Sequence, residues 1–124
     1  MRVVRISKLD QEPVATATPI EGWTGGQVKR TRQTIIPQGG SKFFNCSIVN
    51  FGKGATTGVH VHASDQILVI TSGNGFVSNE HEEHQVAVGD VVHIMAGEKH
   101  VHGATKDSYM GHITITMADG ASSR

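Results

Sequence analysis

The chain has 124 residues and equal numbers of acidic and basic side chains, 11 of each, so its formal net charge is zero. A neutral chain of this length has one domain with its own hydrophobic core, and it lacks the charge that would attract nucleic acid or an anionic membrane. Its single cysteine excludes an internal disulfide, and no apolar run approaches the ~20 residues of a membrane helix. Because the N-terminus lacks the apolar stretch of a signal peptide, we expect a cytoplasmic protein.

Runs of β-branched residues separated by glycine, asparagine and proline predict many short strands and few helices. A first strand at 3–6 precedes a polar, turn-rich segment at 14–26. Central strands are predicted at 27–36, 43–51, 59–62 and 66–71, and a hairpin turn at 72–75. The remaining strands are predicted at 75–78, 85–88, 91–95, 100–104 and 109–117, with an acidic, solvated tip at 80–83.

Many short strands joined by turns indicate an all-β sandwich or barrel. We find no internal repeat and no linker, so the sequence predicts a single domain over residues 1–124. Its core is expected at about 27–117. An N-terminal arm is expected at 1–26 and a frayed tail at 118–124.

All eight histidines lie between His60 and His112, and the first 59 residues contain none. Alternate side chains of a strand share a face, so His60 and His62 point the same way, as do His100 and His102. Imidazole is the commonest side-chain metal ligand near neutral pH, because much of it is uncharged there. The paired histidines therefore predict a polar, metal-binding pocket inside the barrel.

The last predicted strand has one polar and one apolar face. His112, Thr114 and Thr116 point to one side, and Ile113 and Ile115 to the other. We expect the polar side to face the pocket. The apolar side predicts a partner sheet, and hence a homodimer or a higher homo-oligomer.

Two segments resemble the two motifs of the cupin superfamily. The first motif, which supplies two histidines and usually a glutamate to a metal, matches residues 58–66 (GVHVHASDQ). The second, which supplies the last histidine, matches residues 89–100 (GDVVHIMAGEKH). The resemblance implies a double-stranded β-helix, or jelly-roll barrel, with one divalent transition metal per chain inside.

Within this superfamily, the chain resembles small bacterial cupins related to carboxymuconolactone decarboxylase, a branch that includes manganese-dependent hydroxynitrile lyases. In those lyases three histidines and one glutamine hold the metal. The matching residues here are His60, His62, Gln66 and His100. The resemblance also implies that His102 is the general base, with His112 beside it.

The same resemblance places Val49 and Thr57 in the substrate pocket. Three positions depart from the lyases: Met95 replaces a proline, Val101 replaces a tryptophan, and Thr116 replaces a glutamine of the pocket. The first two changes concern packing. The third alters a polar group of the pocket, so the substrate is expected to differ.

Gln66 stands where most cupins have a glutamate. A neutral amide leaves the +2 charge of the metal uncompensated, which makes a stronger Lewis acid and favours anionic ligands such as carboxylate, enolate or cyanide. The alternative for Gln66 is a hydrogen bond to a metal ligand. Manganese is the metal that the resemblance implies, and iron, cobalt, nickel or zinc suit the same donors.

The expected function is metal-assisted acid/base lyase chemistry on a small molecule, an α-hydroxy nitrile or a related carbonyl adduct. One alternative is an enzyme that acts on a carboxylate or sugar acid. Another is a metal-dependent binding module without turnover. Outside the site, we assign His93 to packing or an interface, Cys46 to the core, and His81 and His84 to the solvated tip, while Trp23 is either a pocket lid or a dimer anchor.

Overall fold

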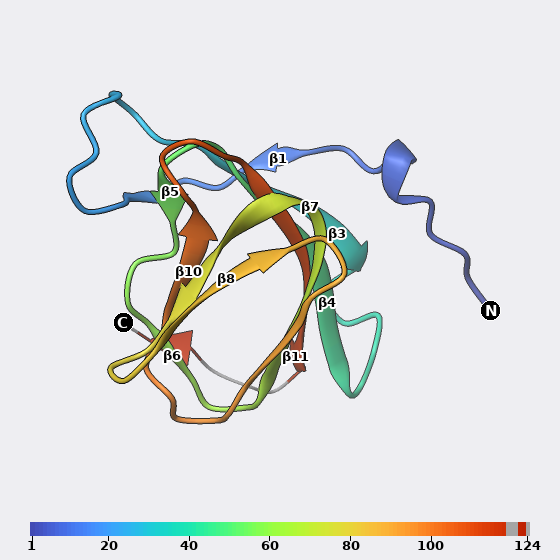
Figure 1. Cartoon of the computed structure of the whole chain (residues 1–124). Coiled ribbons are helices and arrows are strands. Elements are labelled where there is room, and N and C mark those ends of the chain that lie inside the picture. Colours follow the sequence, from blue (N-terminus) through green and yellow to red (C-terminus); the bar gives the residue numbers. More distant parts are fainter. Residues whose placement is uncertain (119–121, 124) are drawn as a thin grey trace.

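The computed structural model describes residues 1–118 and 122–123. Its strands curl into a single barrel-shaped domain (Figure 1). The elements in chain order are a 3₁₀ turn η1 (Ile6–Lys8) and the strands β1 (Glu12–Pro13), β2 (Thr18–Pro19), β3 (Arg30–Ile36), β4 (Phe44–Phe51), β5 (Ala55–Thr56), β6 (Val61–His62), β7 (Gln66–Ser78), β8 (Glu83–Ala87), β9 (Val91–Ile94), β10 (Val101–Ala104), β11 (Met110–Met117) and β12 (Ser122–Ser123). No helix in the described ranges has the length and hydropathy to cross a membrane.

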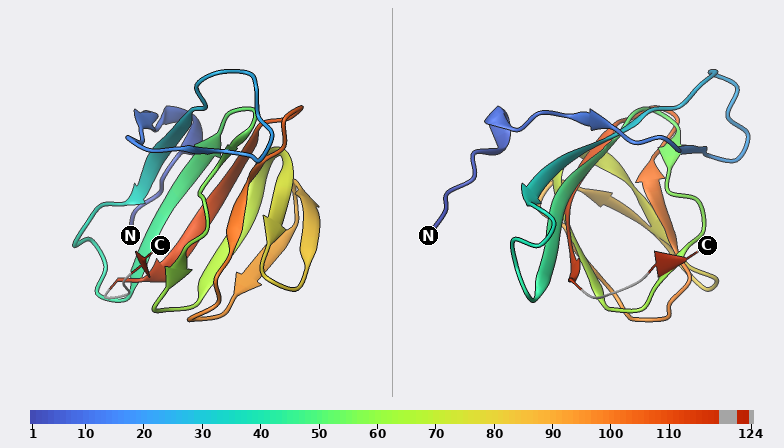
Figure 2. Two further views of the ribbon diagram at one scale, coloured as in Figure 1. Left: turned by 90° about the vertical axis from the view of Figure 1, so that its left-hand side faces the viewer. Right: turned by 180° about the vertical axis from the view of Figure 1, so that it is seen from behind.

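Ten strands form one sheet in the order β1-β3-β4-β11-β7-β10-β5-β2, and β8 and β9 also pair with β7. Figure 2 shows β3, β4, β11 and β7 side by side as one wall. The first part of β7 pairs with β9 and β11, and its last part pairs with β8 and β10. Strand β7 thus belongs to both walls, and its bend closes the barrel.

The continuity of β7 corrects the hairpin predicted at 72–75. Gly73 adopts φ +63°, and the ladder with β11 shifts register between Gly111 and His112. A Cβ at Gly73 would collide with the carbonyl oxygen of Tyr109. Glycine here therefore allows a bend and a close approach between two strands, rather than a reversal of the chain.

The strand predicted at 3–6 is also wrong, because these residues form no strand and the 3₁₀ turn η1 begins at Ile6. This part of the arm lies against the outer face of β3, where the Gln33 amide donates to the carbonyl of Leu9 at 3.1 Å. Its backbone does not join a sheet edge there, and the N-terminus projects away from the barrel (Figure 1). Further along the arm, β1 pairs with β3 and β2 pairs with β5.

The expected tail at 118–124 falls partly outside the described residues, which omit 119–121 and 124. Within the described part, β12 pairs with β6. On β11, Ile113 and Ile115 are half-buried rather than exposed. The homo-oligomer that these residues led us to expect stays a prediction.

The interior of the barrel is divided into an apolar and a polar part. The apolar core contains Leu68 and Ile70 of β7, and it extends to the strands β8, β9 and β10. Phe51 and Met110 close it at the ends of β4 and β11. The inner faces of β3, β4 and β11 carry polar side chains instead, and these border the pocket described below.

Candidate metal centre and substrate pocket

His60 and His100 form an antiparallel backbone pair that joins the two cupin motifs. The amide of His60 donates to the carbonyl of His100 at 2.9 Å, and the amide of His100 donates back at 3.0 Å. Residues paired in this way have their side chains on one face, and the two ring centroids lie 4.1 Å apart. His62 follows on β6, with its ring 4.8 Å from that of His60. The candidate ligand nitrogens of the three histidines lie within 4.8 Å of one another.

The backbone sets the tautomer of two of these imidazoles. Nδ1 of His60 lies 2.9 Å from the carbonyl of Gly58, and Nδ1 of His100 lies 2.9 Å from the carbonyl of Glu98. A carbonyl can only accept, so both Nδ1 atoms carry a proton and both Nε2 atoms keep a lone pair. Burial lowers the pKa of His100, which favours the neutral ring. This is the state in which a histidine binds a metal.

Gln66 supplies a fourth donor atom. Its amide nitrogen donates to the Thr114 hydroxyl at 2.7 Å, which leaves its oxygen 3.2 Å from Nε2 of His100. When the His100 ring is neutral, its Nε2 and the Gln66 oxygen point lone pairs at each other. A cation bound by both atoms would stabilise this arrangement. His62 adds a buried Nε2 without a hydrogen-bond partner among the described residues. Burial is the main cause that lowers the pKa of His62, and electrostatic repulsion from His100 lowers it further. Three imidazole nitrogens and one amide oxygen thus fit a divalent transition metal.

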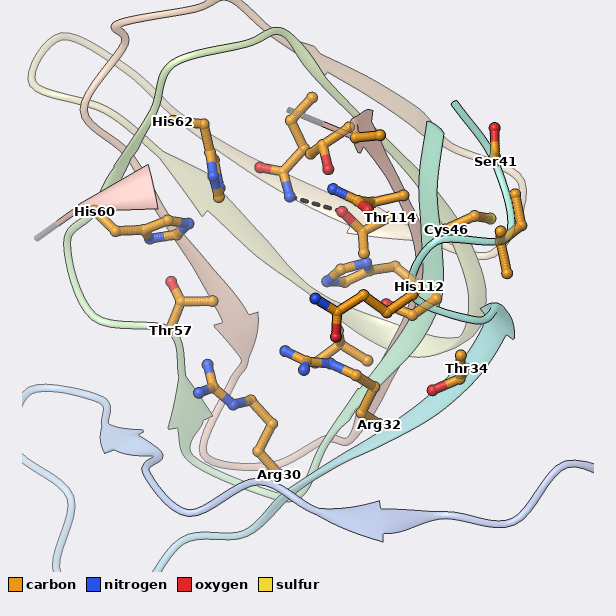
Figure 3. Close-up of a pocket in the computed structure, with 18 of the residues that line it drawn as sticks. Arg30, Arg32, Thr34, Ser41, Cys46, Thr57, His60, His62, His112 and Thr114 are labelled. Carbon is orange, nitrogen blue, oxygen red and sulfur yellow. Dashed lines mark hydrogen bonds between the residues drawn. The ribbon is translucent and has the colours of Figure 1, made fainter. Parts of the chain in front are cut away.

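A pocket of about 940 Å³ opens beside this donor set (Figure 3). Val49, Thr57 and Thr116 line this cavity, together with His60, His62 and Gln66, whereas His100 lies outside the lining residues. The ladder registers explain the polar wall, because His112 on β11, Val49 on β4 and Arg32 on β3 form one row across three strands. Thr114, Ser47 and Thr34 form the next row.

His102 and His112 also line the pocket. Their ring centroids lie 4.8 Å apart, and the His102 ring is 5.5 Å from that of His60. Burial lowers the pKa of His102 well below its ordinary value, with smaller contributions from the neighbouring histidines. Burial also lowers the pKa of His112 to about 4, assisted by the positive charge of Arg30. Both rings are therefore neutral at physiological pH.

Several ring nitrogens here lack a hydrogen-bond partner in the described part of the chain: Nδ1 of His102 and both nitrogens of His112. Buried polar atoms of this kind are rare in folded proteins and call for an explanation.

Thr57 holds the backbone of β10 in place. Its hydroxyl donates to the Gly58 carbonyl at 2.7 Å and accepts from the amide nitrogen of His102 at 3.3 Å. The structure thus places His102 beside the metal donors, while its role as a base stays a prediction.

Sequence reasoning missed two charged groups of the pocket, Arg30 and Arg32 on β3. The segment 30–34 reads Arg-Thr-Arg-Gln-Thr, and a strand without apolar alternation could have indicated a polar inner face. Cys46 corrects an expectation: it is half-buried at the border of the pocket rather than in the apolar core, and burial raises the pKa of its thiol.

The remaining candidates lie outside the centre. His93 is exposed and contacts Asp65 at 2.8 Å, and His84 is exposed with its Nε2 3.4 Å from Glu82. Trp23 packs over Gly54 and donates from its indole to the Gly26 carbonyl at 2.7 Å, and it does not line the pocket. Within the described residues, one cluster alone has three metal-ligating side chains close together.

The chain matches known proteins in sequence and in fold. Residues 47–116 match the cupin domain family. A stretch of 68 residues, 54% of the chain, is 40% identical to the (R)-mandelonitrile lyase of Granulicella tundricola. The match covers 52% of that enzyme, so the chain spans about half the length of this curated relative.

Solved structures with the same fold carry varied functions in their names. A cupin-like protein of Thermotoga maritima superposes with a TM-score of 0.73 at 26% identity, covering 86% of this chain and 84% of that one. The polyketide cyclase RemF of Streptomyces resistomycificus gives 0.78 at 14% identity, with 96% and 80% covered. A predicted oxalate decarboxylase of T. maritima gives 0.74 at 18% identity, with 94% and 98% covered. The solved structures share the fold, and because the family match spans more than half of its length, the chain belongs to the cupin family.

Proposed function

We propose that this cupin binds one divalent transition metal per chain and catalyses acid/base lyase chemistry on an α-hydroxy nitrile or a related carbonyl adduct. The proposed ligands are His60, His62, Gln66 and His100. The observation that carries the proposal is the contact between the Gln66 oxygen and Nε2 of His100, where two acceptor atoms lie 3.2 Å apart. The 40% identity to (R)-mandelonitrile lyase supports the reaction class.

The chemistry that a bound metal supplies here is Lewis-acid polarisation of a substrate oxygen or stabilisation of an anion. Manganese is the proposed metal, and iron, cobalt, nickel and zinc suit the same donors. Because all four donors are neutral, no ligand charge offsets that of the ion.

His102 is the proposed general base. Its ring lines the pocket and lies 5.5 Å from the ring of His60, so a substrate hydroxyl held beside the donor set comes within reach of its unprotonated nitrogen. His112 lies beside it and remains neutral, because burial keeps its pKa near 4. We assign His112 the task of holding the substrate through a hydrogen bond. Val49 and Thr116 shape the pocket around the reacting carbon.

Turnover of mandelonitrile by the metal-loaded protein tests this proposal. We expect His102→Ala to keep fold and metal but to lose about 10²–10⁴-fold in turnover, the usual contribution of a positioned acid/base group. His84→Ala, a matched change at an exposed histidine, should leave turnover unchanged. Wild-type turnover in His102→Ala would remove the assigned base. A metal-loaded wild-type protein without lyase activity on any α-hydroxy nitrile would favour a binding module or an enzyme for carboxylates.

A further inference from the structure

Three neighbouring strands carry a row of hydroxyl groups along one wall of the pocket. Thr34 of β3 pairs with Ser47 of β4, and Ser47 pairs in turn with Thr114 of β11. All three residues line the pocket, and Figure 3 shows Thr34 and Thr114 at its border. Thr114 follows His112 by two residues, which is about 7 Å along the strand. The hydroxyl row therefore runs beside the histidines of the candidate site.

These hydroxyl groups have hydrogen-bonding capacity that the described part of the protein leaves unused. The side chains of Thr34 and Ser47 form no hydrogen bond with another described residue. The Thr114 hydroxyl accepts from the Gln66 amide at 2.7 Å, which leaves its own hydrogen available to a ligand. One row away, His112 is only 1% exposed, and both of its ring nitrogens lack a partner among the described residues. Because buried polar atoms are normally paired, this wall favours a polar ligand.

Hydrocarbon side chains are scarce on the same wall. In the row that joins Arg32, Val49 and His112, only Val49 is apolar. On the other side of the hydroxyl row, Asn45 pairs with Thr116, and both are polar. The other apolar side chains of the lining lie toward the end of the wall where β3 and β11 stop: Ile36, Cys46 and Ala118. An aromatic ring held against the hydroxyl row would leave its polar groups unpaired, which costs free energy.

We propose that the row of Thr34, Ser47 and Thr114 binds the hydroxyl groups of an aliphatic polyol chain, so that the natural substrate is a sugar-like compound rather than an aryl one. That this chain belongs to the reacting molecule rests on the proposed function, which places the reacting oxygen beside His102; the binding of a polyol does not. A hydroxyl group both donates and accepts, so a polyol can satisfy the row in either direction. A site that bonds substrate hydroxyls rejects analogues without them, because its own polar groups then stay unpaired.

Titration of the full chain, followed by nuclear magnetic resonance, compares xylitol with pentane-1,5-diol, which has the same carbon chain but lacks the inner hydroxyls. We expect xylitol to bind more tightly than the diol and than benzyl alcohol. Thr34→Val and Ser47→Ala should each weaken xylitol binding about 2- to 10-fold, the net value of one hydrogen bond, and leave the affinity for the diol nearly unchanged. Thr34→Ser keeps the hydroxyl and should bind xylitol like the wild type. Thr71→Val, the same change at an exposed position of β7 outside the pocket, should leave every affinity unchanged.

The same titration in the presence of a chelator separates this inference from the proposed function. Xylitol binding that persists without metal and falls in Thr34→Val and Ser47→Ala supports the hydroxyl row, whatever the outcome with mandelonitrile. Xylitol binding that the chelator abolishes and that both substitutions leave intact would overturn it, since the polyol would then occupy the metal. No binding of xylitol, equal affinities for xylitol and the diol, or tighter binding of benzyl alcohol would overturn it as well.

Discussion

The amide nitrogen of Gln66 donates to the hydroxyl of Thr114 at 2.7 Å, and this bond turns the amide oxygen toward His100. The two residues are 48 positions apart, one at the start of β7 and one in the middle of β11. A threonine of β11 thus orients a donor of the first cupin motif. Partners of this kind raise the affinity of a metal site without touching the metal.

Replacing Thr114 by valine keeps the shape of the side chain but removes the acceptor. We expect Thr114→Val to weaken metal binding by about 10–100-fold, because the Gln66 amide loses the bond that orients it. Thr114→Ser keeps the hydroxyl and should bind metal like the wild type. Competition with a chromogenic chelator measures both affinities. Equal affinities in Thr114→Val and the wild type would show that Gln66 does not depend on Thr114.

The neutral charge of Gln66 has a separate consequence. Gln66→Glu should keep or tighten metal binding, because a carboxylate is a better ligand for a divalent cation than an amide. The same change should weaken the binding of azide or cyanide at the metal, since the site loses one unit of positive charge. Titration of the metal-loaded proteins with azide compares the two. The same azide affinity in both forms would contradict the charge argument.

Burial of His112 predicts a loss of stability in acid. Its pKa falls from the ordinary value of 6.5 to about 4 in the folded protein. Between these values the unfolded chain binds a proton that the folded chain does not, so the free energy of unfolding is highest above pH 6.5 and declines as the pH falls toward 4. The contribution is about 1.4 kcal/mol per pH unit, or about 3 kcal/mol over the whole window.

His112→Gln tests this contribution in urea unfolding at a series of pH values. The variant should lose less stability on acidification, with a slope smaller by about 1.4 kcal/mol per pH unit between pH 6.5 and 4. His84→Gln, at an exposed position, should follow the wild type. Parallel curves for His112→Gln and the wild type would mean that His112 titrates alike in both states.

The strands around the cupin motifs were predictable because their residues alternate between an inner and an outer face. The strand predicted at 109–117 corresponds to β11, and its polar residues line the pocket as expected. The strand predicted at 43–51 corresponds to β4. The prediction of a hairpin at 72–75 was wrong because a glycine at a bend within a strand and a glycine at a chain reversal look alike in sequence. The close contact with Tyr109, which shows that Gly73 lies at a bend, is not visible in the sequence.

The histidine cluster was predictable from motif spacing, whereas the arginine pair was not. His60 and His100 each belong to a motif whose residues lie close together in sequence. Arg30 and Arg32 reach the pocket only because β3 pairs with β4 in a register that faces them inward. The bond from Gln66 to Thr114 likewise depends on the pairing of β7 with β11. Such registers arise from contacts between distant segments, which local patterns do not contain.

Metal content is the measurement that tests the central claim most directly. The wild-type chain should hold about one equivalent of a divalent transition metal after dialysis. His62→Ala should lose most of it while the barrel stays folded, because the apolar core lies elsewhere in the interior. His84→Ala, an exposed histidine outside the cluster, should retain it. Full metal occupancy in His62→Ala, or none in the wild type after loading with manganese, would contradict the assignment of this site.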